Sequence, residues 1–221
     1  MTIRIAMLLY PNLTQLDLTA PYEVLARLPG AEVSLVWKTL EPVTSGTGLW
    51  LSPNATLSEA AQADVLFVPG GNGVVPLLRD PEVLSFVRRQ AANARYVTAV
   101  CTGSLLLGAA GLLEGYRATT HWAYHEFLER CAAIPVRQRV VIDRNRVTAG
   151  GVTAGLDFGL RLAAELAGEQ AARAIQLQLE YDPEPPFDSG TPERATPELM
   201  ELVLGRLAQY KSGYAEQLPA R

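Results

Sequence analysis

The sequence changes character abruptly at Cys101. Residues 96–100 form a short apolar run rich in β-branched side chains, which predicts a buried strand, and a helical pattern begins at Gly103. A side chain at such a junction lies at the edge of a sheet and faces the N–H groups of a helix N-terminus, where negative charge is favoured. The junction therefore predicts a nucleophile elbow that carries Cys101. The alternative is that Cys101 is a small buried hydrophobe.

Strand and helix patterns alternate along residues 1–181. The expected strands are residues 3–10, 31–40, 64–69, 96–100, 136–142 and 146–148. The expected helices are residues 13–28, 80–94, 122–131, 154–166 and 169–181, together with one that begins at 103. Pro21 is expected near the start of the regular part of the first helix. This alternation predicts an α/β fold with a mostly parallel sheet that is covered by helices on both faces.

The C-terminal part of the chain has a different composition. Residues 182–192 are rich in proline and are not expected to be helical, whereas residues 197–214 form an amphipathic pattern. We therefore expect a domain over residues 1–181, followed by a tether and a C-terminal helix over 182–221. That helix packs on the domain or on a second subunit, or the segment remains an exposed tail.

Composition excludes several classes of function. The net charge of −4 offers no basic stripe for nucleic acid. The longest apolar run, residues 105–113, is too short to span a bilayer, so no membrane partner is expected. The chain begins without the charged and apolar segments of a signal peptide, and its two cysteines form no disulfide framework. These features predict a cytoplasmic location.

Four pieces of the sequence are expected to meet at the carboxyl edge of the sheet, where open parallel sheets bind ligands. They are Asp17, the pair Gly70-Gly71, Cys101, and the segment 119–122. Asp17 stands between two leucines, so it is either a helix cap or an acid in an apolar pocket with a raised pKa. In a pocket it could donate a hydrogen bond to the sulfur and transfer protons.

Supporting roles are expected around this cluster. Thr102 can cap the helix through its hydroxyl, and its N–H, with those of Gly70 and Gly71, could form a cradle for a developing anion. His121 is a candidate base near the thiol, or an ordinary polar residue at a helix start. His125 would share a helix face with it, but nothing completes a metal site, so no metal or other cofactor is expected.

The motifs together resemble the ThiJ/PfpI superfamily. They are Ala99-Val100-Cys101-Thr102-Gly103, Val68-Pro69-Gly70-Gly71 and Ala118-Thr119-Thr120-His121-Trp122. The resemblance covers roughly residues 1–180 and implies a flavodoxin-like three-layer sandwich similar to class I glutamine amidotransferases. Within the superfamily, segments such as Gln15-Leu16-Asp17-Leu18-Thr19 resemble the branch that hydrates isonitriles.

The resemblance implies a cofactor-independent reaction in which water adds to a small-molecule isocyanide and gives an N-substituted formamide. It makes Cys101 the nucleophile, Asp17 its acid/base partner and Thr102 a supporting residue, and it implies a homodimer. Many members of the superfamily carry Glu where this chain has Asp17, which favours the hydratase branch. The chemistry calls for a thiol of low pKa, a thioimidate intermediate and one proton-shuttling acid.

Three other functions are compatible with these residues. A glyoxalase or deglycase would use the same cysteine, and a redox sensor would use an oxidisable Cys101 beside an acid. A ligand-sensing transcription regulator of the AraC type carries a similar domain, but it needs a DNA-binding module longer than the residues that follow Pro192.

Overall fold

The computed structural model describes residues 2–218. Its centre is a seven-stranded sheet in the order β10-β11-β7-β6-β1-β2-β5, in which β10 is antiparallel to its neighbour and all other pairs are parallel. The strands are β1 (Ile3–Leu8), β2 (Ala31–Trp37), β5 (Ala55–Thr56), β6 (Val65–Val68), β7 (Tyr96–Val100), β10 (Val140–Asp143) and β11 (Arg146–Ala149). The predicted α/β fold with a mostly parallel sheet is confirmed.

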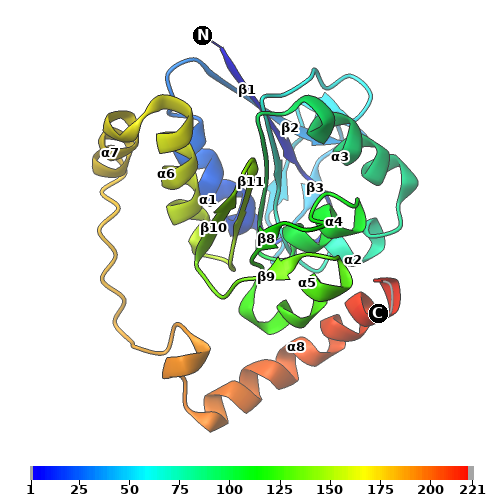
Figure 1. Ribbon diagram of the computed structural model, residues 1–221, viewed down its shortest axis with the longest axis vertical. Coiled ribbons are helices and arrows are strands. Elements are labelled where there is room, and N and C mark those ends of the chain that lie inside the picture. The colour runs from blue at the N-terminus through cyan, green and yellow to red at the C-terminus, as the bar shows by residue number, and fades with distance from the viewer. Residues whose placement is uncertain (1, 219–221) are drawn as a thin grey trace.

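Helices cover both faces of the sheet, which gives three layers (Figure 1). One layer contains α1 (Gln15–Leu25), α6 (Ala154–Ala167) and α7 (Glu169–Gln178), and the other contains α2 (Val74–Leu77), α3 (Pro81–Asn93) and α4 (Gly103–Ala109). Strands β6 and β7 are almost entirely buried because helices pack on both of their faces. Their apolar side chains belong to one continuous core.

Smaller elements surround this sandwich. They are the hairpin β3 (Val43–Thr44) and β4 (Trp50–Leu51), the pair β8 (Arg117–Ala118) and β9 (Ile134–Pro135), the 3₁₀ helices η1 (Trp122–Tyr124) and η2 (Pro192–Arg194), and the helices α5 (Glu126–Arg130) and α8 (Pro197–Gln217). The expected helix over 122–131 is wrong as a single element, because η1 and α5 divide it. Within residues 2–218 no helix is long and apolar enough to cross a membrane.

Pro21 lies inside α1, not near its start. A proline within a helix removes one backbone hydrogen bond and needs room for its ring. Gly155 of the neighbouring α6 supplies that room, because a Cβ added there would meet the Pro21 ring at 3.0 Å. Close packing of α1 on α6 thus compensates for the proline and fixes the helix that carries Asp17.

The C-terminal helix α8 runs across the end of the sandwich at which the strands point, and an extended segment connects it to α7 (Figure 1). Most of α8 is exposed, but Tyr214 near its end is fully buried. The end of α8 therefore packs on the body of the same chain.

Candidate active site

The strand-to-helix elbow expected at Cys101 is present between β7 and α4. Cys101 has a φ of 55°, a left-handed conformation that non-glycine residues rarely adopt. The surroundings hold it there, since its N–H donates to Ala149 O at 3.0 Å and its carbonyl accepts from the Thr120 hydroxyl at 2.8 Å and the Ser104 hydroxyl at 3.0 Å. Such a conformation costs of order 1–3 kcal/mol and persists where neighbours over-determine it, typically at functional sites.

Asp17 lies in the first turn of α1 and is fully buried, and Thr14 occupies the N-cap position, so the helix-cap interpretation is wrong. Neither carboxyl oxygen makes a hydrogen bond of good geometry. Burial raises the pKa of Asp17 to about 7, opposed by the Cys101 thiol and the Gly70 N–H that face it. The prediction of an acid in an apolar pocket is confirmed, and near neutral pH this acid can both give and take a proton.

The prediction of a thiol with a low pKa is wrong. Burial raises the pKa of Cys101 well above its usual value, and the charge on Asp17 raises it further. The N–H and hydroxyl of Thr102 act in the opposite direction but do not prevail. The N-terminus of α4 is not enough to lower the pKa of the thiol, because α4 has only seven residues and the sulfur is shielded from water. The resting site therefore holds a neutral thiol next to a carboxyl group that can accept its proton.

Gly70 allows Cys101 and Asp17 to approach each other. A Cβ added to Gly70 would lie 2.6 Å from Thr102 N, 2.7 Å from Cys101 Cβ and 2.8 Å from Asp17 Oδ2. No other residue type fits at this position, because each of these contacts is shorter than a real Cβ tolerates. The absence of a side chain at Gly70 is what allows the carboxyl and the thiol to face each other.

Thr102 does not cap α4 through its hydroxyl, contrary to the prediction. Its Oγ1 instead accepts a hydrogen bond from Gly71 N–H at 3.0 Å. Because that N–H is already committed, Gly71 does not supply a donor to an anion cradle as predicted. The backbone N–H groups of Gly70 and Thr102 remain as the candidates for this role.

The two histidines have separate surroundings and do not share one helix face as predicted. His121 Nδ1 accepts from Ala123 N–H at 3.3 Å, which leaves the ring proton on Nε2, whereas His125 Nε2 lies 3.1 Å from the Thr119 hydroxyl. Burial, and then the nearby His125, lower the pKa of His121 to about 4, so its ring is neutral near pH 7. No cluster within residues 2–218 has three or more side chains suited to holding a metal ion.

Gly151 is a site residue that sequence reasoning missed. A Cβ added there would lie 2.2 Å from His121 Cδ2 and 3.3 Å from Cys101 Sγ, so the ring and the sulfur flank this glycine. The only signal was the Gly150-Gly151 pair after a predicted strand, which is typical of many turns. Tyr214 was also missed: its hydroxyl donates to Gly71 O at 3.0 Å. No local pattern marks it, because the two residues are 143 positions apart.

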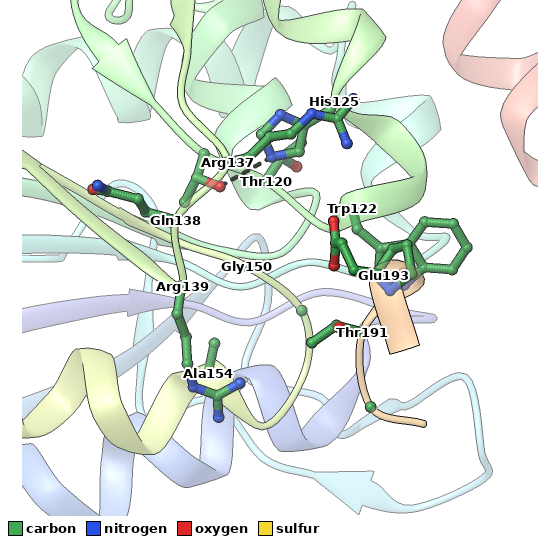
Figure 2. Close-up of a pocket in the computed structure, with 14 residues that line it drawn as sticks. Thr120, Trp122, His125, Arg137, Gln138, Arg139, Gly150, Ala154, Thr191 and Glu193 are labelled. Atoms are coloured by element: carbon green, nitrogen blue, oxygen red, sulfur yellow. Dashed lines mark hydrogen bonds between the residues drawn. The ribbon is translucent and has the colours of Figure 1, made fainter. Parts of the chain in front are cut away.

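A pocket of about 200 Å³ adjoins the elbow. Gly151 is one of the residues that line it, and Thr120, Trp122, Ala154 and Thr191 lie around it in Figure 2. Arg139 lies at one side of this pocket in the same view, and it is paired with Asp157 at 2.6 Å. The pocket therefore combines apolar surface from Trp122 with charged side chains such as Arg137 and Glu193. Gly151, one of its lining residues, lies next to Cys101 Sγ.

Comparison with known proteins places this site in a family. The model of the DJ-1/PfpI family matches residues 3–165. The chain belongs to the DJ-1/PfpI family. Among curated members, an isonitrile hydratase from Pseudomonas putida is 58% identical over 208 residues, covering 94% of this chain and 91% of that protein. The transcriptional regulator GbdR from Pseudomonas aeruginosa is 34% identical, over 80% of this chain and 50% of the regulator.

Solved structures of DJ-1/PfpI proteins show the same fold. A ThiJ/PfpI family protein from Pseudomonas syringae superposes with a TM-score of 0.96 at 44% identity, covering 98% of this chain and 90% of that one. Drosophila melanogaster DJ-1beta has a TM-score of 0.77 at 23% identity, covering 83% of this chain and all of that one. The first match extends over nearly the whole chain, and with it over the C-terminal helix.

Proposed function

We propose that this protein is an isonitrile hydratase, which adds water to an isocyanide and releases the N-substituted formamide. The observation that carries the proposal is the buried pair of Cys101 and Asp17 at a strained elbow. The similarity to an isonitrile hydratase over 94% of the chain supports it. The pair has the two groups that the reaction needs, a nucleophile and an acid whose pKa is close to neutral.

The first half of the reaction joins the thiol to the substrate. The carboxylate of Asp17 takes the proton from Cys101 as Sγ forms a bond to the terminal carbon of the isocyanide. The same proton then passes to that carbon, which gives a thioimidate, R–N=CH–S–Cys. Because thiol and carboxyl exchange one proton, the site never has to hold two negative charges at once.

The second half hydrolyses this intermediate. Asp17 takes a proton from water as the water oxygen bonds to the thioimidate carbon, and it passes this proton to the nitrogen. The carboxylate then takes the hydroxyl proton of the adduct as the carbonyl of the formamide forms and the C–S bond breaks, and it returns that proton to the sulfur. One water is consumed, and thiol and carboxyl return to their starting states.

The remaining site residues orient the substrate. The N–H groups of Gly70 and Thr102 face Asp17 and the sulfur respectively, where charge develops during both halves. His121 is neutral and carries its proton on Nε2, which suits a hydrogen bond to the substrate nitrogen. The pocket beyond Gly151 receives the organic group of the substrate.

Turnover of cyclohexyl isocyanide tests the proposal, with formamide release followed by mass spectrometry. The wild type is expected to produce cyclohexyl formamide, and Cys101→Ala is expected to produce none. Cys131→Ala is the matched control, because Cys131 is equally buried but packs against Gly108, away from the elbow. Formamide from Cys101→Ala at the wild-type rate would contradict the covalent mechanism. No formamide from the wild type would contradict the function, and methylglyoxal and peroxide would then test the glyoxalase and redox-sensor alternatives.

We also propose a homodimer, built from a domain over residues 1–181 that is followed by a tether and a C-terminal helix over 182–221, of which residues 219–221 lie outside the described part of the chain. The segment between α7 and η2 follows an extended path outside the sandwich in Figure 1, and it carries Phe187, which is 79% exposed. An extended segment with an exposed aromatic side chain is suited to packing on a second copy. Light scattering is expected to give twice the mass of one 23.9 kDa chain, and a single-chain mass would contradict the dimer.

A further inference from the structure

The end of α8 is held on the body by two arginines. Arg79 and Arg130 donate hydrogen bonds to carbonyl oxygens in the last turn of the helix and just beyond it. The acceptors are Ala215, Glu216, Gln217 and Leu218, at 2.7–3.1 Å. Carbonyls at a helix C-terminus lack partners within the helix and carry partial negative charge, so two guanidinium groups stabilise this end strongly. These hydrogen bonds fix the position of Tyr214, the residue that directly precedes the four acceptors.

Tyr214 reaches from this anchored turn to the active-site loop. Its ring is fully buried against Tyr124 and Phe127, with ring centroids 5.1 and 6.0 Å apart. Its hydroxyl donates to the carbonyl of Gly71 at 3.0 Å. A buried tyrosine usually packs its ring and needs one hydrogen-bond partner, and here that partner belongs to the loop beside the catalytic pair.

The Gly70-Gly71 loop needs such a restraint. Gly71 has a φ of 126°, a conformation open essentially to glycine alone, and two adjacent glycines are intrinsically flexible. Five hydrogen bonds of the described residues fix the loop. The first two are Thr14 N–H to Gly70 O at 3.0 Å and Gly71 N–H to Thr102 Oγ1 at 3.0 Å, and the other three reach Gly71 O from the Tyr214 hydroxyl at 3.0 Å, Val74 N–H at 3.1 Å and the Thr102 hydroxyl at 3.4 Å. The second of these connects the loop to the residue whose N–H and hydroxyl face the sulfur.

We propose that Tyr214 is a positioning residue for the Cys101–Asp17 pair. Its hydroxyl fixes the Gly71 peptide, the Gly71 N–H fixes the Thr102 side chain, and Thr102 in turn holds its donors at the sulfur. The role in turnover rests on the proposed function, whereas the effect on Cys101 reactivity does not. The C-terminal helix is then part of the catalytic machinery, although it follows the residues matched by the family model.

Tyr214 acts through position and not through charge. The titratable groups around Cys101 come from α1, from η1 and its N-cap, from α8 and from the segment after β1. They are Asp17, His121, Tyr124, Tyr214 and Tyr10. Burial raises the pKa of each of the three tyrosines, and burial lowers that of His121, so all four are neutral near pH 7. Only Asp17 in this set titrates near neutrality.

Tyr214→Phe tests the proposal, because it removes the hydroxyl and keeps the ring. With cyclohexyl isocyanide we expect kcat to fall by about 10-fold with KM within about 2-fold, since one buried hydrogen bond is lost. We also expect the apparent pKa for alkylation of Cys101 by iodoacetamide to rise by about 0.5, because Thr102 then stabilises the thiolate less well. Tyr210→Phe, one turn earlier on α8, is the control and should change neither quantity.

A lower melting temperature with unchanged kcat and an unchanged alkylation pKa would overturn the proposal, because Tyr214 would then be structural only. The double variant Tyr214→Phe/Thr102→Val tests the route. If Tyr214 acts through Thr102, the double variant should lose no more activity or thiol reactivity than Thr102→Val alone, and additive losses would overturn the route.

Two further measurements keep the test decisive. If Tyr214→Phe does not fold, Arg79→Met removes two anchors of α8 at an exposed side chain, and it should change kcat and the alkylation pKa in the same direction but less. No change in either would overturn the proposal. If the wild type does not hydrate isocyanides, the proposed function fails, but the alkylation pKa of Cys101 still decides the role of Tyr214.

Discussion

Asp17 and Asp80 both lie at helix starts, but they have opposite environments. Asp80 caps α3: its carboxylate accepts from the N–H groups of Glu82 and Val83 at 3.0 and 3.2 Å and pairs with Lys38 at 2.5 Å. Partial burial raises the pKa of Asp80, but Lys38 and the two N–H groups outweigh it, so the pKa is lowered. Asp17 has none of these partners and its pKa is raised.

The difference separates a carboxylate that stays ionised from one that can exchange a proton near neutral pH. Asp80 is ionised at all physiological pH values, so it cannot exchange protons there, but its charge stabilises the fold. Asp17 is kept near the point of half-ionisation by burial, which destabilises its charged form in the fold but suits proton transfer. Catalytic residues often reduce stability in this way.

The largest expected effect is on activity. Asp17→Asn cannot exchange a proton with the thiol, so kcat for cyclohexyl isocyanide should fall by about 10²–10⁴-fold. Asp80→Asn should leave kcat unchanged, because Asp80 belongs to the start of α3 and not to the elbow. Steady-state kinetics on both purified variants measure the contrast. Similar losses in the two variants would remove the distinction drawn between them.

The pH profile should report Asp17 directly. The carboxylate form accepts the thiol proton, so kcat/KM is expected to rise with pH and to level off above the Asp17 pKa of about 7. Asp17→Asn should show no such limb in its residual activity. Rates measured from pH 5.5 to 8.5 test this, and a wild-type profile that is flat through pH 7 would assign the base role elsewhere.

The free energy of unfolding should fall with rising pH because of Asp17, whereas the activity should rise. In the folded state Asp17 keeps its proton up to about pH 7, whereas in the unfolded chain it loses it near pH 4. The free energy of unfolding therefore falls as pH rises between these values, by roughly 2–4 kcal/mol. Asp17→Asn does not ionise, so its stability relative to the wild type should increase by this amount from pH 5 to pH 8. Urea unfolding at both pH values measures it, and an equal difference at the two would contradict the assignment.

Local signals predicted most of the fold and much of the site. The elbow at Cys101 follows from a strand pattern that changes to a helix pattern within two residues, and the helix expected over residues 80–94 is present as α3. The meeting of Asp17 with Cys101 follows from parallel strands, whose carboxyl ends share one edge. These inferences need only nearby residues and the handedness of βαβ units.

The failures concern properties that depend on distant residues. The prediction of a low thiol pKa is wrong because the pKa of Cys101 depends on how completely the surrounding elements exclude water from the sulfur. The hydroxyl of Thr102 is expected to cap its own helix, but it accepts a hydrogen bond from the N–H of Gly71, 31 positions away. Tyr214 is 143 positions from its partner, and an amphipathic helix does not reveal which of its side chains enters the body.

The smallest expected effect comes from the Asp80 cap itself. Asp80→Ala leaves two N–H groups of α3 without their side-chain acceptor, which should lower the free energy of unfolding by about 1 kcal/mol at pH 7. The pairing of Asp80 with partly exposed Lys38 adds little to this, because exposed ion pairs contribute about 0–1 kcal/mol. The pKa of Asp80 is lowered, so its contribution is present above pH 4 and disappears as pH falls through the folded value. In urea unfolding, the free-energy difference between Asp80→Ala and the wild type should therefore be smaller at pH 3.5 than at pH 7. The difference between Asp17→Asn and the wild type should instead become larger as the pH rises. A difference that stayed constant, or a loss of kcat in Asp80→Ala, would show that the two helix starts are not as independent as their surroundings indicate.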